Sequence, residues 1–325
     1  MDTQTSTKPA IGRYIDIRSD WGFKHIFSGA VPSKDILIQF IDDLLGGKGR
    51  IRDLTYGPTE HLGETAEQKK VIFDLRCTTD DGAEVIVEMQ RMDHENLRER
   101  MVFSTSRLIS NQYPKGAKYW DFQLPEVIFI GVLEFRLDDD RREHYLKHIK
   151  LVEGHTGEIF YDKLSFILLE LPNFAKDEAE IESDVDRWFW LLNNLSRANK
   201  VPTFMDRRVF PQVFQISEVS RLTKEERMAY EASLQDRWVW DNAISLAERK
   251  AATKAAKEAD QLATSRERAK AEKLLAKERT KAKQERTKAE QDKIQSAKSL
   301  KATGALSDKQ IAESLKLPLD VVKKL

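Results

Sequence analysis

Apolar residues recur at helical spacing in two segments near the start of the chain. The first segment, WGFKHIF, follows Ser19-Asp20, which supplies the kind of residue that caps a helix start. The second begins at Ser33 and ends at Gly46-Gly47. Its apolar face comprises Ile36, Leu37, Phe40, Ile41, Leu44 and Leu45. We therefore predict two N-terminal helices, the second over 33–45.

Shorter apolar runs follow, and these predict strands. The expected strands cover 51–56, 69–78, 83–90, 126–135 and 164–171. Residues 69–78 and 83–90 flank the turn sequence Thr79-Asp80-Asp81-Gly82, so we expect them to pair as a hairpin. The run EVIFIGVLEF at 126–135 is almost wholly apolar, which is typical of a strand buried on both faces.

Helical spacing returns at 93–113 and again at 177–198. The expected buried face of the first of these helices comprises Leu97, Met101, Ser104, Thr105 and Leu108. The second contains the run WFWLL from Trp188, which we interpret as core because it is so rich in apolar side chains. The order helix, three strands, helix, strand indicates a mixed α/β (α+β) domain that ends near residue 200.

The C-terminal part of the chain has a different composition. Residues 248–302 are mostly Ala, Lys, Glu, Arg and Gln without Gly or Pro, which favours one long helix. They lack a sustained heptad pattern, so we expect a solvated helix rather than a strong coiled coil. Residues 303–325 predict a small helix-turn-helix-like pair. The expected organisation is a disordered N-terminus at 1–14, a folded domain at 15–200, a helical extension at 201–247, the basic helix and this tail.

Composition and charge narrow the class of protein. The chain of 325 residues has no apolar run of roughly 18 residues, so we expect no membrane span. A single cysteine, Cys77, excludes a disulfide scaffold and a cysteine-based zinc site and favours a cytoplasmic location. The net charge is zero, yet residues 1–247 carry −9 and residues 248–302 carry +8. The basic helix could contact phosphates through charge alone, with a solvated spacer as the alternative.

One face of the predicted hairpin carries the candidate chemistry. A turn centred on Asp81 sets Asp74 directly opposite Glu88, and alternation puts Gln90 on the same face. The opposite face is apolar and comprises Val71, Phe73, Leu75, Cys77, Val85, Val87 and Met89. Two adjacent carboxylates repel each other, and Mg²⁺ suits such a pair because it takes oxygen ligands and keeps several waters. We therefore predict a metal site at Asp74 and Glu88, with Gln90 bonded to the attacking water or a phosphate oxygen.

The same face also has a purely structural interpretation, in which its charged side chains pair with one another and bind no metal. Arg76 shares the face and would form a solvated cross-strand ion pair with Glu84 or Glu88. The register is also an inference, because a slip of one residue would move one carboxylate to the other face. The spacing alone leaves both interpretations open.

A resemblance rests on three stretches: SDWGFKHIF at 19–27, the acids Asp74 and Glu88 with Met89-Gln90, and RMVFSTSRLISNQYPKGAKYWDFQLPEVIFIGVLEF at 100–135. In these the chain resembles the Rpn family of recombination-promoting nucleases, or putative transposases, of the PD-(D/E)XK nuclease superfamily. The resemblance extends over residues 15–195, and the last twenty or so residues resemble the short helical tail of many members.

The resemblance implies a restriction-endonuclease-like αβββαβ core with a mixed sheet, in agreement with the order of elements expected above. It implies that Asp74 and Glu88 are the metal-binding acids, and that Gln90 stands where the superfamily usually has a lysine. Gln90 cannot supply the positive charge of that lysine near the scissile phosphate. Asp20 would be a further acid of the metal site or, equally, a helix cap, and Lys24 is a further catalytic candidate in the same SDxxFK stretch.

The first functional hypothesis is therefore a Mg²⁺-dependent DNA endonuclease, with Mn²⁺ as a substitute and a role in recombination or with transposons. The expected partners are DNA and a second copy of the chain, which would form a homodimer through the C-terminal helix. One rival is a catalytically inactive nuclease fold that binds DNA or oligomerises, which the acidic body favours, because a DNA cleft should not be strongly negative without metal. The other rival is a coiled-coil-like structural interaction protein built on 248–302.

Overall fold

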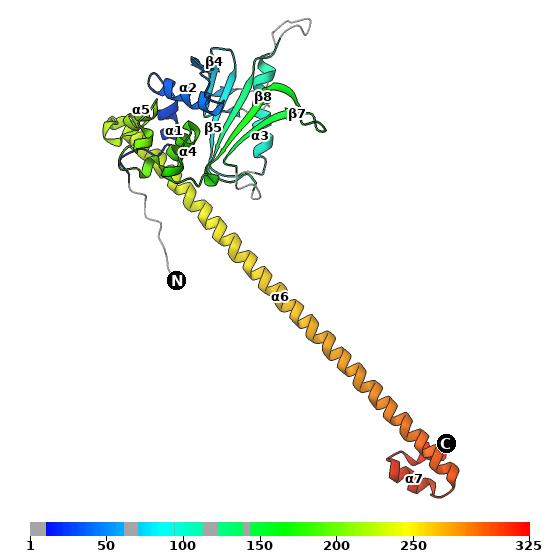
Figure 1. Ribbon diagram of the computed structural model, residues 1–325. Helices are drawn as coiled ribbons and strands as arrows, with labels where there is room; N and C mark the ends of the chain where they lie inside the picture. The colour runs from blue at the N-terminus through cyan, green and yellow to red at the C-terminus, as the bar shows by residue number, and fades with distance from the viewer. Residues whose placement is uncertain (1–10, 62–70, 94, 113–122, 139–143) are drawn as a thin grey trace. The chain divides into compact units, whose positions relative to one another are not determined.

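The computed structural model describes residues 11–61, 71–93, 95–112, 123–138 and 144–325. Contacts within the chain divide it into two compact units, Met1–Asn242 and Ala243–Leu325. The first unit holds the sheet and its helices, and the second holds the C-terminal helices (Figure 1). Within the described ranges, every helix is too short or too polar to cross a membrane.

A six-stranded mixed sheet forms the centre of the first unit, in the order β1-β4-β5-β6-β8-β7. Its strands are β1 (Leu54–Tyr56), β4 (Leu75–Thr79), β5 (Glu84–Gln90), β6 (Val127–Leu133), β7 (Leu146–Val152) and β8 (Ile159–Glu170). The neighbours β5, β6 and β8 run parallel, and the remaining pairs are antiparallel. All seven residues of β6 are buried, as the apolar run at 126–135 predicts. β2 (Glu60–His61) and β3 (Val71–Ile72) form a separate antiparallel pair.

Helices cover both faces of this sheet (Figure 1). The helices on one face are α1 (Asp20–Phe27), α2 (Ser33–Leu44), α4 (Asp184–Asn194) and α5 (Phe210–Ser217). Phe27, Phe40 and Trp188 meet in their core, where apolar burial stabilises the fold. Short 3₁₀ helices cover Leu171–Asn173, Glu178–Glu180, Leu195–Arg197, Thr203–Met205 and Val219–Arg221.

The other face is covered by α3 (Leu97–Asn111). All five residues that the sequence predicts for its inner face are buried, and Leu97, Met101 and Leu108 pack against Ile86 and Phe129 of the sheet. The chain therefore has the predicted αβββαβ core, formed by α2, β1, β4, β5, α3 and β6. The helix start expected at Ser19-Asp20 is also present, and its cap is Ser19, whose hydroxyl accepts a hydrogen bond from the Gly22 N–H at 3.1 Å.

The predicted strand 69–78 is wrong in one respect, because it breaks at Phe73 and Asp74. β3 ends at Ile72 and β4 begins at Leu75, while residues 69 and 70 lie outside the described residues. Phe73 donates its backbone N–H to the Thr59 carbonyl at 2.8 Å. Its ring packs in the α3-facing core rather than with Leu75 and Cys77, because an interruption of the strand resets the alternation of faces.

Two other predicted elements have different limits. The helix expected over 177–198 covers Asp184–Asn194, because Ser183 caps it and Glu178–Glu180 forms a separate 3₁₀ helix. The strand expected at 164–171 is the C-terminal half of β8, and β7, which pairs with it, was not predicted. β7 is an edge strand whose residues are all half-buried or exposed, so it lacks the apolar run that marks a buried strand.

The start of α4 contains a buried carboxylate that is held by several donors. Asp186 is 1% exposed and accepts hydrogen bonds from Lys176 Nζ at 2.9 Å and from the Tyr145 hydroxyl at 2.8 Å. Burial alone would raise the pKa of Asp186, but the Lys176 ammonium and the Ser183 N–H outweigh it and lower that pKa to about 2. The ionised carboxylate therefore stabilises the folded state.

We expect Asp186→Asn to lower the free energy of unfolding by about 2 kcal/mol at neutral pH, from the lowered pKa. Because the folded-state pKa lies below the ordinary value of 3.8, this stabilisation is complete above about pH 5 and is lost as the pH falls toward 2. Urea denaturation of both proteins at pH 7, 4.5 and 3 would measure it. The difference should fall to about half at pH 3. A difference that stayed constant over this range would contradict the prediction.

The second unit is made of the distal part of α6 (Lys224–Thr303) with α7 (Asp308–Leu315) and α8 (Leu319–Lys323). Its small core contains Ala297, Ile311, Ala312 and Val322. The predicted pair of short helices is present, and the Ser307 hydroxyl caps α7. The basic stretch 248–302 is helical as predicted, but α6 begins 24 residues earlier, at Lys224, and its first turns belong to the first unit.

Candidate active site

The predicted hairpin brings Asp74 and Glu88 to the same end of the sheet. β4 and β5 pair with Leu75 opposite Val87 and Arg76 opposite Ile86, and Asp74 and Glu88 each lie one residue beyond the last of these pairs. The Asp74 Oδ2 atom accepts a hydrogen bond from the Met89 N–H at 2.8 Å, which ties this carboxylate to the end of β5. The turn at Asp81 therefore gives the register that the sequence predicts, although the strand itself starts only at Leu75.

Burial and neighbouring acidic charges oppose ionisation of both carboxyls. Glu88 is 8% exposed, and burial together with the charge of Asp74 raises its pKa to about 7. Hydrogen bonding from Gln90 and the charge of Arg100 act in the opposite direction. Burial also raises the pKa of Asp74, against the Met89 N–H and the charge of Lys24. Two carboxyls that hinder each other in this way form a site that a cation would stabilise.

The oxygen atoms of this pair fit a hard divalent cation. Asp74 uses Oδ2 for the Met89 N–H and Glu88 uses Oε2 for Gln90, whereas Asp74 Oδ1 and Glu88 Oε1 have no hydrogen-bond donor among the described residues. Over the same residues no group of three or more His, Cys, Asp or Glu side chains converges on one point. One or two carboxylates with water and substrate oxygens are the usual set for Mg²⁺, so the two acids suffice.

A cleft of about 550 Å³ reaches Asp74 from solvent. It is lined by Asp74 and Met89, by Arg18 and the start of α1, and by the first turns of α6. Asp20 lines the cleft as well, and its charge raises the pKa of Asp74. Asp74 is therefore accessible to a ligand of small-molecule size.

The remaining predicted site residues are Gln90, Asp20 and Lys24, and each interacts with one of the acids or with another of the three. The Gln90 amide donates to Glu88 Oε2 at 2.7 Å, so it orients that carboxylate. Asp20 and Lys24 form an ion pair of 2.8 Å in α1, and the cap is Ser19 rather than Asp20. Arg76 forms the cross-strand ion pair that the structural interpretation predicted, with Glu84 as its partner at 3.0 Å.

Sequence reasoning missed Arg100. This exposed residue lies in α3, and its charge lowers the pKa of both Asp74 and Glu88. It follows the buried Leu97 by three positions and precedes the buried Met101, so it stands at the border of the helix face that packs on the sheet. Only the packing of α3 brings it to the carboxylates, and no spacing within the sequence predicts that.

A comparison with protein families found a match over most of the first unit. The sequence model of a family described as PD-(D/E)XK nuclease family transposase matches residues 17–248. The chain belongs to this family. The matched range includes both acids, Gln90, Arg100 and the α6 turns that line the cleft. No curated protein and no solved structure matched the chain.

Proposed function

We propose that this protein is a metal-dependent nuclease that hydrolyses phosphodiester bonds of DNA, with Asp74 and Glu88 as the metal-binding acids. The observation that supports it best is the hairpin of β4 and β5, at whose end the half-buried Asp74 lines a cleft and its charge acts on the buried Glu88. Family membership supports the same class of reaction and a divalent metal ion. Mg²⁺ is the expected ion, with Mn²⁺ as a substitute, and recombination is the expected setting.

Each residue then has a defined task. When bound, the ion would neutralise charge on the phosphate and lower the pKa of the attacking water. Asp74 and Glu88 would hold it through the oxygens that have no hydrogen-bond donor, and the Met89 N–H and Gln90 amide keep those carboxylates oriented. The Gln90 side-chain carbonyl has no hydrogen-bond partner among the described residues, and it could bind the attacking water.

The positive charge that Gln90 lacks would come from Arg100. Both carboxyls experience the charge of Arg100, and Asp74 also experiences that of Lys24. Lys24 is paired with Asp20, whose negative charge offsets the positive charge of Lys24. The exposed Arg100 is therefore the better candidate to stabilise the negative charge that develops on the phosphate.

We expect Arg100→Ala to lower the cleavage rate about 10- to 100-fold, because one cation near the reacting phosphate is removed. Arg100→Lys should retain a larger part of the activity. Arg98→Ala is the matched control, since Arg98 lies in the same helix but pairs with Asp138. Initial rates of plasmid nicking at fixed Mg²⁺ would measure all three variants. Equal losses for Arg98→Ala and Arg100→Ala would assign the effect to general surface charge.

Incubation with supercoiled plasmid in the presence of Mg²⁺, Mn²⁺ or EDTA tests the proposal. Nicking that requires the metal supports a nuclease. A shift of the plasmid without nicking supports the rival, an inactive fold that binds DNA. Absence of any DNA affinity at low salt would favour the structural interaction protein, for which a second copy joined through the C-terminal helix remains a prediction.

A further inference from the structure

One face of a helix lines the cleft together with Asp74. Ala229, Ala232, Ser233, Asp236, Arg237 and Trp240 of α6 line the cleft. They recur at three- and four-residue steps, so they form a single stripe of the helix. The cleft therefore has Asp74 and Met89 on one side and the first turns of α6 on another.

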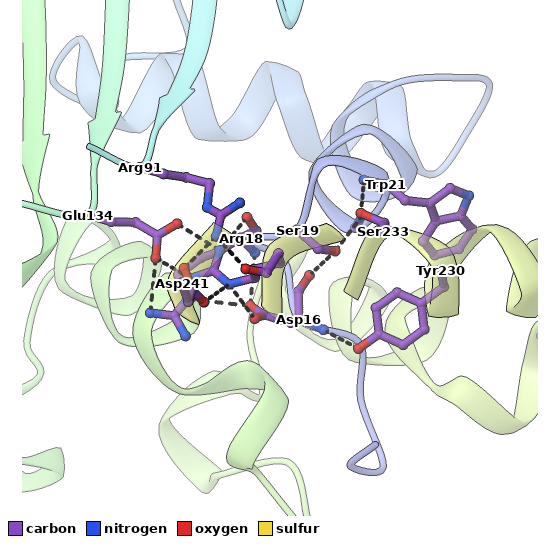
Figure 2. A network of polar contacts seen from close by, with 11 residues as sticks. Asp16, Arg18, Ser19, Trp21, Arg91, Glu134, Tyr230, Ser233 and Asp241 are labelled. Atoms are coloured by element: carbon purple, nitrogen blue, oxygen red, sulfur yellow. Dashed lines mark hydrogen bonds and ion pairs between the residues drawn. The ribbon is translucent and has the colours of Figure 1, made fainter. Parts of the chain in front are cut away.

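A network of polar contacts fixes this wall (Figure 2). Arg237 makes a two-fold ion pair with Glu134, which follows β6, and also donates to the Arg18 carbonyl at 2.7 Å. Asp241 accepts a hydrogen bond from Arg91, which follows β5, at 2.6 Å. The Asp16 and Trp21 backbone N–H groups donate to the Tyr230 and Ser233 hydroxyls at 2.8 Å and 3.2 Å. The helix is therefore tied to two strands and to the start of α1.

The size of the cleft limits what reaches Asp74 past this wall. A volume of about 550 Å³ lies in the range of pockets for single small molecules. It is large enough for roughly one or two nucleotides, whereas a base-paired duplex presents two strands and is far wider. Because the wall is held at several points, duplex entry would require breaking those contacts.

The cleft also offers aromatic surface to a base. Trp240 lines it and is 60% exposed, which is unusual for so large an apolar side chain. Trp21 lines it too, but its ring is already stacked on His25 with ring centres 4.4 Å apart. Stacking of a base on an exposed aromatic ring contributes about 1–3 kcal/mol and does not depend strongly on the base.

We propose that this cleft binds an unpaired DNA nucleotide, whose base stacks on Trp240 while its strand passes Asp74. The protein then acts on single-stranded or unpaired DNA in preference to intact duplex. The assignment of the strand to the reaction rests on the proposed nuclease function. The stacking itself is a binding property that requires neither metal nor hydrolysis.

The test measures binding of the full chain in EDTA, so that no cleavage occurs. Fluorescence anisotropy with a labelled ten-residue oligothymidylate and with a blunt duplex would give both Kd values. A salt concentration near 0.2 M suppresses the sequence-blind contribution of the basic helix. We expect Trp240→Ala to weaken binding of the oligothymidylate about tenfold, which corresponds to about 1.4 kcal/mol, and to leave duplex binding unchanged. Trp240→Phe should retain most of the affinity.

Val239→Ala is the matched control, because Val239 is its neighbour in α6 and is 51% exposed but does not line the cleft. It should bind the oligothymidylate as the wild type does. Unchanged binding in Trp240→Ala, or an equal loss in Val239→Ala, would overturn the proposal. If the proposed nuclease function is wrong but the binding proposal is right, the result differs. Binding would still depend on Trp240, but wild-type protein with Mg²⁺ would cleave neither substrate.

Discussion

Asp74→Asn and Glu88→Gln are each expected to reduce Mg²⁺-dependent DNA cleavage at least about 1,000-fold, because each removes one anionic ligand of the metal. The substitutions keep the shape of the side chains, so the register of β4 and β5 should persist. Burial and neighbouring acidic charges raise the pKa of both carboxyls, which means that the metal-free fold gains nothing from ionising them together. We therefore expect thermal stability without metal to be equal to that of the wild type or higher, while activity is lost.

Plasmid nicking over a series of Mg²⁺ concentrations, with a parallel melting curve, would measure both quantities. Glu84→Gln is the matched control, since Glu84 also lies in β5 but pairs with Arg76. It should cleave at a rate near that of the wild type. Full activity in Asp74→Asn or Glu88→Gln would refute the assignment of the metal site, and a collapse of the fold in both would show that the pair is structural.

Arg237→Ala is expected to lower the free energy of unfolding by about 2 kcal/mol, because it removes one of the two guanidinium groups, those of Arg237 and Arg18, that pair with the partly buried carboxylates of Glu134 and Asp16. Arg237 and Glu134 are 14% and 11% exposed, and Asp16 lies 3.6 Å from the same guanidinium. Burial alone would lower the pKa of Arg237, but its bond to Glu134 outweighs burial and raises it. The charged pair therefore stabilises the contact between α6 and the strand ends, and its loss should also reduce cleavage by loosening the wall of the cleft.

Urea denaturation with a paired activity assay would measure this effect. Arg227→Ala serves as the control, because Arg227 is an exposed residue of α6 whose pairing with Glu231 should contribute less than about 1 kcal/mol. Combining Arg237→Met with Glu134→Gln should recover part of the lost stability, since it removes both charges of the pair. A double variant as unstable as the sum of the two single variants would mean that the two residues act independently.

Local patterns accounted for most of the elements. The cap at Ser19, the buried face of α3 and the wholly buried β6 followed from spacing within a few residues. The pairing of β4 with β5 also followed, because turn length and alternation of faces set the register of a hairpin without help from distant residues. For the same reason the sequence predicted that Asp74 and Glu88 lie together, which is the central feature of the candidate site.

Features that depend on distant contacts were missed or displaced. The break at Phe73 follows from the hydrogen bond of its N–H to the Thr59 carbonyl and from the packing of its ring under α3. Neither contact can be predicted from the alternation of apolar and polar residues along the strand. Arg100 was missed because only the packing of α3 brings it to the acids. The first turns of α6 were expected as part of a general helical extension, and nothing in their composition indicated a wall of the cleft.

The sequence by itself determined the order of elements, the acidic hairpin and the family, since these depend on spacing and residue type over short stretches. The tertiary structure decided which charges surround the acids and how wide the approach to them is. Arg100, Arg237 and Trp240 act across contacts between segments far apart in the chain, as in the pairing of Arg237 with Glu134. Such contacts arise when several elements bury their apolar faces together, and a pattern within one element does not encode which neighbour it will meet.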